Sequence, residues 1–495
     1  MFKHAGFALF TLATLTACGG GDFGKSSPSE LGSSSGFLDR LTVADKYLYV
    51  RLPRTGLTPE FAATTGFNPD HIKDEQFVFG YIDRLSWNSL SRDVSSNIAL
   101  LDAKEWAHFR HDPQTLERIE DLQDSRGGSL DETGREGYHN YNALTTELRN
   151  LADQHPSLLT VYSAGQSVQG RELWYVRISA TAPDQDTSAA GPKLLYIANM
   201  HGDETTGREM MIYLIRQLVN EYATNPRVAT LVNNAQIFIM PSMNPDGFEL
   251  SQRYNKNGVD LNRDFPDFTS DPTDTPVGRA DETQHIMRLH DQHHFDLAVN
   301  FHGGEVCFNL PWDTKTNKTL ADRFGDDPVL SSLGREYADA NPTMKARNGG
   351  SFTNGLTYGY EWYEVDGGMQ DWASLYRQSV HATVELSYTK YPSSSFLATA
   401  WRENQESMLA FLERGLRGVH LRIVNEAGTP VAGASVNVSS AHRAITYSGS
   451  TLNRVTLGGD QRVTIDVPGM ATTVVQLPAA GFAGAYQEVV LPSQK

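Results

Sequence analysis

Continuous apolar runs alternate with amphipathic stretches through the middle of the chain. Four of the runs are typical of buried strands: KLLYIANM and, each with polar residues at its end, QIFIMPSMNP, FDLAVNFHG and VHATVELSY. Between the first two runs, residues 207–222 carry apolar side chains at helical spacing, and an earlier amphipathic stretch ends at Pro156. Strands that alternate with helices predict an α/β fold in which helices cover a mixed, largely parallel sheet.

The hydrophobic pattern changes near residue 418. From there to residue 495, apolar and polar positions alternate with a period of two between frequent turn-forming residues, which predicts a small β-sandwich. We therefore place the main domain at residues 138–417 and the sandwich at 418–495. Residues 37–125 form an extra N-terminal segment with apolar stretches of its own, whose fold the pattern does not assign, and a polar linker follows it.

The first 17 residues have the pattern of an export signal, in which a short basic start precedes an apolar run too short to span a bilayer. The end of this run and Cys18 resemble the lipobox of bacterial lipoproteins, whose cysteine carries the lipid. The Gly/Ser-rich residues 18–36 would then form a flexible tether. In that class the residue after the cysteine influences sorting, and Gly19 favours the outer membrane of the bacterial cell envelope. A plain signal peptide with a coincidental cysteine is the alternative.

Composition narrows the classes of partner and of metal site. The 495 residues include 42 Lys and Arg against 59 Asp and Glu, a formal net charge of −17. Such an acidic chain is not expected to bind nucleic acid. Two cysteines are too few for a disulfide scaffold or a Cys-rich zinc module, so any metal must be held by histidine and carboxylate side chains.

Two His-x-x-Glu pairs follow predicted strands, at the sheet edge where α/β folds place their sites. The pairs are His201 with Glu204 and His302 with Glu305. Catalytic zinc commonly takes two histidines, one glutamate and a water molecule, so only one of the two glutamates can be a ligand. Four histidines within residues 285–294 offer a rival cluster, but its flanking charges favour a solvated helix face.

Further motifs follow in order along the chain: NPDG at 244–247, GVDLNR at 258–263, NFHGG at 300–304, YxxxGGxxDW at 363–372 and TVEL at 383–386. Together they make residues 138–495 resemble the zinc metallocarboxypeptidases. The stretches HGDETTGRE and VELSYTKYP look most like the regulatory branch, the relatives of carboxypeptidases E, D, M and N. Because that branch carries a small transthyretin-like β-sandwich after its catalytic domain, the resemblance implies the same for residues 418–495.

This resemblance implies a role for each matching residue of the metal site. The residues that would bind one Zn²⁺ are His201, Glu204 and His302. Glu305 would lie outside the ligand set, and Asp260 would orient the first histidine. Glu385 would be the general base that takes a proton from the attacking water. Arg253 would stabilise the oxyanion of the transition state.

The resemblance also implies how a substrate is bound. The residues that would bind its free C-terminal carboxylate are Asn262, Arg263 and Tyr363. Asp313 and Gln370 would line a pocket for a Lys or Arg side chain, because a buried carboxylate selects a cation. The sequence thus predicts an enzyme that removes C-terminal residues, Lys or Arg in particular, from peptides or proteins.

Two other functions stay open at this point. One is the trimming of cell-wall peptides, which end in D-residues or diamino acids. The other is a lipid-anchored binding module without activity, although the presence of every metal-binding residue and of Glu385 argues against it. The second cysteine, Cys307, is expected to be a small buried apolar residue.

Overall fold

The computed structural model describes residues 47–53, 67–69, 77–83, 98–101, 137–181, 191–314, 325–439, 445–447 and 449–493, together with residues 87, 90 and 95. The expected signal peptide, the tether and Cys18 lie outside the described residues, as does most of the segment 37–125. Within the described ranges, no helix combines the length and the apolar character that crossing a membrane requires.

The described part of the N-terminal segment is an antiparallel sheet. Its strands are β1 (Tyr47–Pro53), β2 (Asn68–Pro69), β3 (Phe77–Asp83) and β4 (Ala99–Leu101), in the order β2-β3-β1-β4. Leu48, Val50 and Leu52 of β1 are buried, so alternate residues of this strand point into a core.

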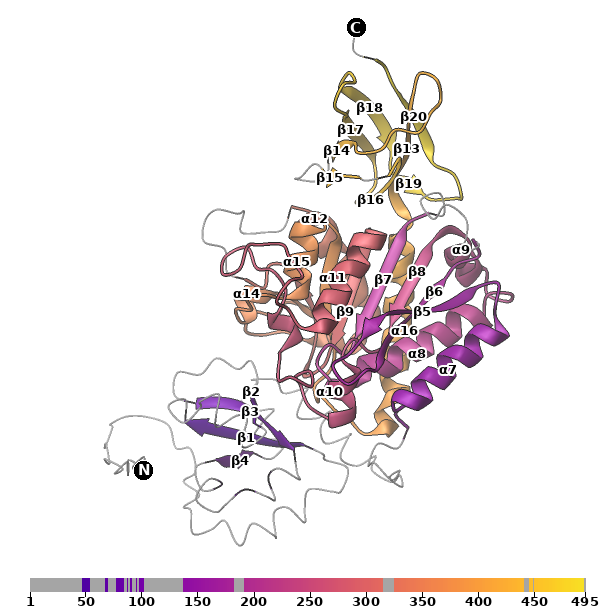
Figure 1. Ribbon diagram of the computed structural model, residues 1–495. Coiled ribbons are helices and arrows are strands. Elements are labelled where there is room, and N and C mark those ends of the chain that lie inside the picture. Colours follow the sequence, from indigo (N-terminus) through magenta and orange to yellow (C-terminus); the bar gives the residue numbers. More distant parts are fainter. Residues whose placement is uncertain are drawn as a thin grey trace, which may run out of the picture. The chain divides into compact units, whose positions relative to one another are not determined.

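The main domain is built around an eight-stranded sheet (Figure 1). Its strands, from edge to edge, are β11 (Leu356–Tyr358), β10 (Glu305–Leu310), β12 (Val380–Ser387), β9 (Leu297–His302), β7 (Lys193–Ala198), β8 (Gln236–Met240), β6 (Glu172–Ile178) and β5 (Leu159–Gln166). The central strands β12, β9, β7 and β8 are parallel, whereas β10 runs antiparallel to β12, and β6 runs antiparallel to both β8 and β5. The predicted mixed, largely parallel sheet is confirmed.

Helices cover both faces of this sheet because its central strands are apolar on both sides. In β7, Leu194 and Tyr196 belong to one core, while Leu195 and Ile197 belong to the other. The helices of the first core are α7 (Tyr141–Gln154), α8 (Thr206–Asn220), α9 (Pro226–Asn234), α12 (Asp327–Ala340) and α16 (Leu397–Arg414). Those of the second core are α11 (Asp281–His293) and α15 (Met369–Tyr376). Shorter helices are α10 (Pro245–Leu250), η3 (Leu261–Arg263), α13 (Pro342–Ala346), α14 (Gly359–Trp362) and η4 (Ser394–Phe396).

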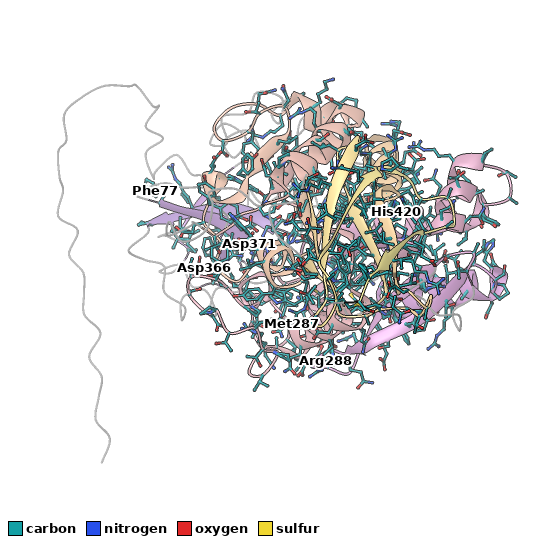
Figure 2. The ribbon with its side chains drawn as sticks, turned by 90° about the horizontal axis from the view of Figure 1, so that it is seen from above. Phe77, Met287, Arg288, Asp366, Asp371 and His420 are labelled. Atoms are coloured by element: carbon teal, nitrogen blue, oxygen red, sulfur yellow. The ribbon has the colours of Figure 1, made fainter. Side chains whose placement is uncertain are left out.

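Helix α11 shows how amphipathic spacing places a helix against the sheet, and it corrects one expectation. Met287 is buried while its neighbour Arg288 is exposed; both are labelled in Figure 2. The same helical phase buries His290, whose ring lies 5.0 Å from the ring centroid of Trp372. The histidine-rich stretch is therefore not exposed to solvent throughout. The exposed charged residues that flank His290 point in other directions around the helix axis.

The C-terminal residues form two packed sheets, as the period-two pattern predicts. One contains β13 (Arg417–Asn425), β16 (Thr451–Val455), β19 (Ala480–Gly481) and β20 (Gln487–Leu491). The other contains β14 (Ser435–Val438), β15 (Ile445–Thr446), β17 (Asp460–Asp466) and β18 (Thr473–Pro478). A buried ion pair between Arg454 of β16 and Asp326 joins this sandwich to the main domain.

Candidate metal centre

The neighbouring strands β12, β9 and β7 carry polar residues at or just after their carboxyl ends. His201 lies in the turn that follows β7, and His302 is the last residue of β9. Glu385 of β12 is in parallel register with His302. The carboxyl ends of parallel strands lie on the same side of a sheet. The topology therefore brings together these residues, which are far apart in the sequence.

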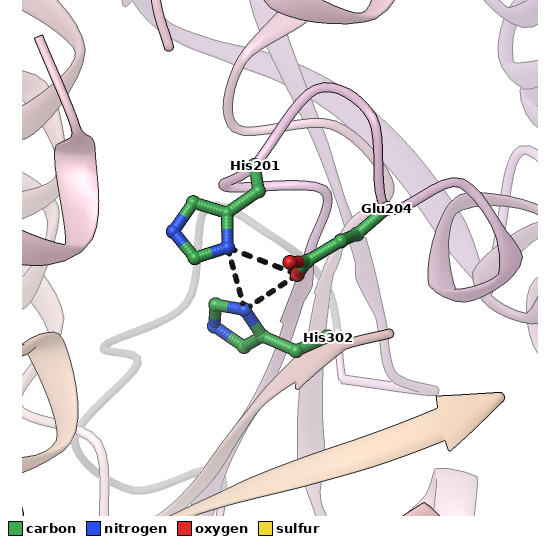
Figure 3. Close-up of side chains that lie close together, drawn as sticks. All are labelled: His201, Glu204 and His302. Carbon is green, nitrogen blue, oxygen red and sulfur yellow. Dashed lines mark hydrogen bonds and ion pairs between the residues drawn. The ribbon is translucent and has the colours of Figure 1, made fainter. Parts of the chain in front are cut away.

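His201, Glu204 and His302 form a compact buried group (Figure 3). Oε2 of Glu204 lies 2.9 Å from Nδ1 of His201 and 2.8 Å from Nδ1 of His302, and the two Nδ1 atoms are 3.1 Å apart. Among the described residues, this is the one group of His, Cys, Asp or Glu side chains whose potential ligand atoms all lie within 4.8 Å of one another.

The donor set of this group fits zinc. Two imidazole nitrogens and one carboxylate oxygen are the ligands of many catalytic zinc sites, which keep a fourth position open. Burial alone would raise the pKa of Glu204, but interactions with His201 and His302 outweigh burial and hold that pKa well below its usual range. Burial lowers the pKa of His302, which favours the neutral imidazole that a metal requires.

Asp260 holds His201 from the side opposite to Glu204. Its Oδ1 lies 3.1 Å from Nε2 of His201, and its Oδ2 accepts a hydrogen bond of 2.9 Å from Nε of Arg253. Burial would raise the pKa of Asp260, but Arg253 and His201 together hold it well below the usual value. An ionised Asp260 can accept a hydrogen bond from the Nε2–H of His201, which leaves Nδ1 directed at Glu204.

Arg253 is buried beside the same group. Its Nη1 lies 3.2 Å from Nδ1 of His201 and 3.4 Å from Oε1 of Glu204. The structure thus places the predicted oxyanion-stabilising arginine next to the predicted metal ligands.

Asn300 is a neighbour of the metal group to which the sequence analysis gave no role. Its Nδ2 lies 2.8 Å from Nε2 of His302, and its Oδ1 accepts a hydrogen bond of 2.9 Å from Thr383. The available signal was the period of the strand, because residues i and i+2 share a face and Asn300 precedes His302 by two positions.

The predicted carboxylate-binding residues lie in the short helix η3 and directly after α14. Asn262 is buried in η3, and its Oδ1 accepts a hydrogen bond of 3.0 Å from the backbone of Met369. Arg263 is exposed. Burial raises the pKa of Tyr363, while the charge of Arg263 acts to lower it and that of Glu385 to raise it, so the phenol lies within electrostatic range of both groups.

Asp313 and Gln370, the predicted pocket residues, are in contact. Oδ1 of Asp313 accepts hydrogen bonds of 2.8 Å from Nδ2 of Asn309 and from Nε2 of Gln370. Burial raises the pKa of Asp313 to about 6, although these two hydrogen bonds and the charge of Arg263 act in the opposite direction. The backbone N–H of Asp313 donates to a further buried carboxylate, that of Asp371.

The second His-x-x-Glu pair separates into two environments. Glu305 begins β10 and forms a buried ion pair with Arg347, with N–O distances of 3.2 and 3.3 Å. Its carboxylate is thus engaged by a cation outside the metal group. Cys307, two residues later on β10, is buried as the sequence predicts.

Comparison with known proteins places this geometry in a family. Residues 144–407, more than half of the chain, match the family described as zinc carboxypeptidase. Carboxypeptidase M of Mus musculus is 33% identical over 379 residues, which cover 72% of this chain and 84% of that protein. Carboxypeptidase D of Anas platyrhynchos is 34% identical over 365 residues, which are 70% of this chain but only 26% of that much longer protein.

Solved structures show the same fold at low sequence identity. Carboxypeptidase A from Helicoverpa armigera superposes with a TM-score of 0.51 at 18% identity, covering 74% of this chain and 97% of that chain. Thrombin activatable fibrinolysis inhibitor superposes with a TM-score of 0.53 at 16% identity, covering 74% of this chain and 98% of that chain. With the family match, the identity to carboxypeptidase M and the buried His-Glu-His group in agreement, the chain belongs to the zinc carboxypeptidase family, whose members act on the carboxyl ends of peptides.

Proposed function

We propose that this enzyme removes Lys or Arg from the C-termini of peptides or proteins, and that Asp313 determines this preference. The Asp313 side chain is only 3% exposed, and within the described ranges it accepts hydrogen bonds from amides and forms no ion pair. Burial of a carboxylate without a cation is costly. The side chain of a C-terminal Lys or Arg would supply the missing cation.

The metal group supplies the centre of the reaction. When held by His201, Glu204 and His302, zinc acts as a Lewis acid that polarises a carbonyl and lowers the pKa of water. Glu385 takes a proton from the attacking water and delivers it to the leaving amine nitrogen. Arg253 stabilises the negative charge that develops on the carbonyl oxygen.

Recognition of a chain end follows from the loops around Arg263. A guanidinium pairs with a carboxylate through two parallel hydrogen bonds, and Arg263 is exposed and therefore accessible to a substrate. Asn262 and Tyr363 complete the binding of the terminal carboxylate. An internal peptide bond offers no such carboxylate, so these residues restrict cleavage to the last residue.

The direct test is a hydrolysis profile over peptides that differ only in their last residue: Arg, Lys, Leu or D-Ala. We expect Arg and Lys to be released at least about tenfold faster than Leu, because only they pair with Asp313. A chelator should stop hydrolysis, and added Zn²⁺ should restore it. Equal rates for Arg and Leu would contradict the basic preference, and fastest release of D-Ala would favour the trimming of cell-wall peptides.

We further propose that Cys18 anchors the enzyme by a lipid in the bacterial cell envelope, at the outer membrane, where its substrates would be met. The support is the lipobox-like end of the signal sequence and the Gly/Ser-rich stretch after it. Cys18→Ser should move the enzyme from the membrane fraction to the soluble fraction. A variant that stays with the membranes would contradict the lipid anchor.

A further inference from the structure

A buried lysine lies behind the metal group. Lys390 is 2% exposed, and its Nζ lies 3.5 Å from Oε1 of Glu204 and 3.6 Å from Oδ2 of Asp203. Asp203 is itself completely buried. Neither Lys390 nor Asp203 belongs to the proposed metal ligands or to the substrate-binding residues.

The two carboxylate oxygens of Glu204 have different neighbours. Oε2 faces Nδ1 of both metal-binding histidines, as Figure 3 shows. Oε1 faces two cations, with Nη1 of Arg253 at 3.4 Å and Nζ of Lys390 at 3.5 Å. A rotation of the carboxylate would break contacts on both sides, so the cations keep Oε2 directed at the position between the histidines.

The backbone around Lys390 joins the segments that carry the metal ligands and the base. Its carbonyl oxygen accepts a hydrogen bond of 3.0 Å from the N–H of Thr205, the residue after Glu204. Oγ of Ser387, at the end of β12, lies 3.0 Å from Oγ1 of Thr206. The turn from Ser387 to Lys390 therefore connects the strand of Glu385 to the turn that bears His201 and Glu204.

The charges around Lys390 are balanced. A buried ammonium next to a site for a divalent cation is unfavourable unless an anion compensates it. Asp203 provides that anion and offers no atom to the His201–Glu204–His302 group. The Lys390–Asp203 pair therefore adds no net charge to the site. An effect of this pair on metal binding would come from the orientation of Glu204 and not from the net charge of the site.

We propose that Lys390, compensated by Asp203, is a positioning residue of the metal centre. It holds Oε1 of Glu204 so that Oε2 is presented to zinc, and it keeps the metal-binding turn in a fixed relation to Glu385. This role depends on Glu204 being a ligand of the zinc site proposed above.

The test removes both charges together, in the double variant Lys390→Met with Asp203→Asn. This variant keeps the net charge and leaves no unpaired buried ion, so a change in metal binding reports on the position of Glu204. We expect zinc to bind about 10–100-fold more weakly in a chelator competition. The absorption spectrum of the Co²⁺-substituted protein should change as well. Unchanged zinc affinity together with an unchanged Co²⁺ spectrum would overturn the proposal.

A matched control removes a buried ion pair whose printed contacts include no member of the metal group, with Arg454→Met and Asp326→Asn. This control should leave zinc affinity and the Co²⁺ spectrum unchanged, and an equal loss in both double variants would overturn the positioning role. The single variant Lys390→Met leaves Asp203 buried without its cation, so it should melt at a lower temperature than the double variant. A single variant as stable as the double variant would contradict the pairing of Lys390 with Asp203.

The same measurements separate the two proposals. A wild-type enzyme that binds no stoichiometric zinc would overturn the ligand set itself. A wild-type enzyme that binds zinc, with a double variant that binds it equally well, would overturn only the role of Lys390.

Discussion

The two His-x-x-Glu pairs of this chain share a spacing but not a structure. His201 and Glu204 lie in one turn after β7, and their side chains converge at 2.9 Å. His302 ends β9, whereas Glu305 begins β10, because the chain reverses between the two residues. Glu305 then pairs with Arg347. The difference shows that a three-residue spacing defines a metal site only when the backbone between the residues keeps both side chains on one side.

The largest effect should come from the glutamate that faces both histidines. Glu204→Gln removes the anionic ligand, so we expect loss of stoichiometric zinc and of hydrolysis, measured by metal analysis and peptide assay. The matched variant Glu305→Gln should keep both. Zinc retained in the first variant or lost in the second would reverse the comparison between the two pairs.

The neighbouring strand β12 carries Glu385, the carboxylate that we propose acts as the general base without binding metal. Glu385→Gln should lower turnover by about 10²–10⁴-fold, because the attacking water loses its general base, while zinc stays bound. Single-turnover kinetics and metal analysis measure the two effects separately. Near-normal turnover in this variant would contradict the assignment of Glu385 as the general base.

A measurement of the stability of the protein tests the ion pair that Glu305 forms with Arg347. Glu305→Gln removes the carboxylate that pairs with buried Arg347, and the loss of one partner of a buried ion pair should reduce the free energy of unfolding by about 3–5 kcal/mol. Denaturant unfolding of the zinc-loaded protein measures this loss. Unchanged stability would show that Arg347 does not depend on Glu305.

The smallest effect concerns Asp313, a buried carboxylate with neither a metal nor an ion-pair partner among the described residues. Asp313→Asn keeps the shape of the side chain but removes its charge, so the ratio of kcat/KM for C-terminal Arg over Leu should fall at least about tenfold. The variant should still release Leu. An unchanged ratio would refute the role of Asp313 in the pocket.

Proton binding offers a second measurement of the same pocket. Burial raises the pKa of Asp313 to about 6, so the carboxylate is charged above that pH and neutral below it. The preference for Arg, measured as the ratio of kcat/KM values, should therefore decline as the pH falls through about 6. In Asp313→Asn the ratio should not vary over this range, and a wild-type ratio that stays constant would speak against the titration.

The parts of the fold that could be predicted from sequence are those with a strong local pattern. KLLYIANM is apolar on both faces of a strand, so its burial between two helical layers could be inferred from the sequence alone. The phase of His290 could not, because its exposed neighbours Arg288 and Asp291 dominate the local composition. In the N-terminal sheet only the longer strands can carry a period-two pattern, as β1 does, because β2 (Asn68–Pro69) and β4 (Ala99–Leu101) are too short to show one.

The candidate site divides in the same way. Ordered motifs predicted the metal ligands and the base, and the structure brings the three predicted ligands together. Lys390 and Asp203 lie 187 positions apart in the sequence, so no local spacing predicts that they form an ion pair. Arg347 could not be assigned to Glu305 for the same reason. Such contacts arise from tertiary packing, and only the structure shows them.

Gly359 limits which residues can stand beside the proposed specificity pocket. A Cβ at this position would collide with Oδ1 of Asp313, so any larger residue would displace the carboxylate. Residue 359 must therefore remain glycine as long as Asp313 is kept. Gln370 reaches the same oxygen through its side-chain amide, which donates a hydrogen bond of 2.8 Å. A change of C-terminal preference, in evolution or by design, would therefore have to start with a substitution of Gln370 or of Asp313 itself.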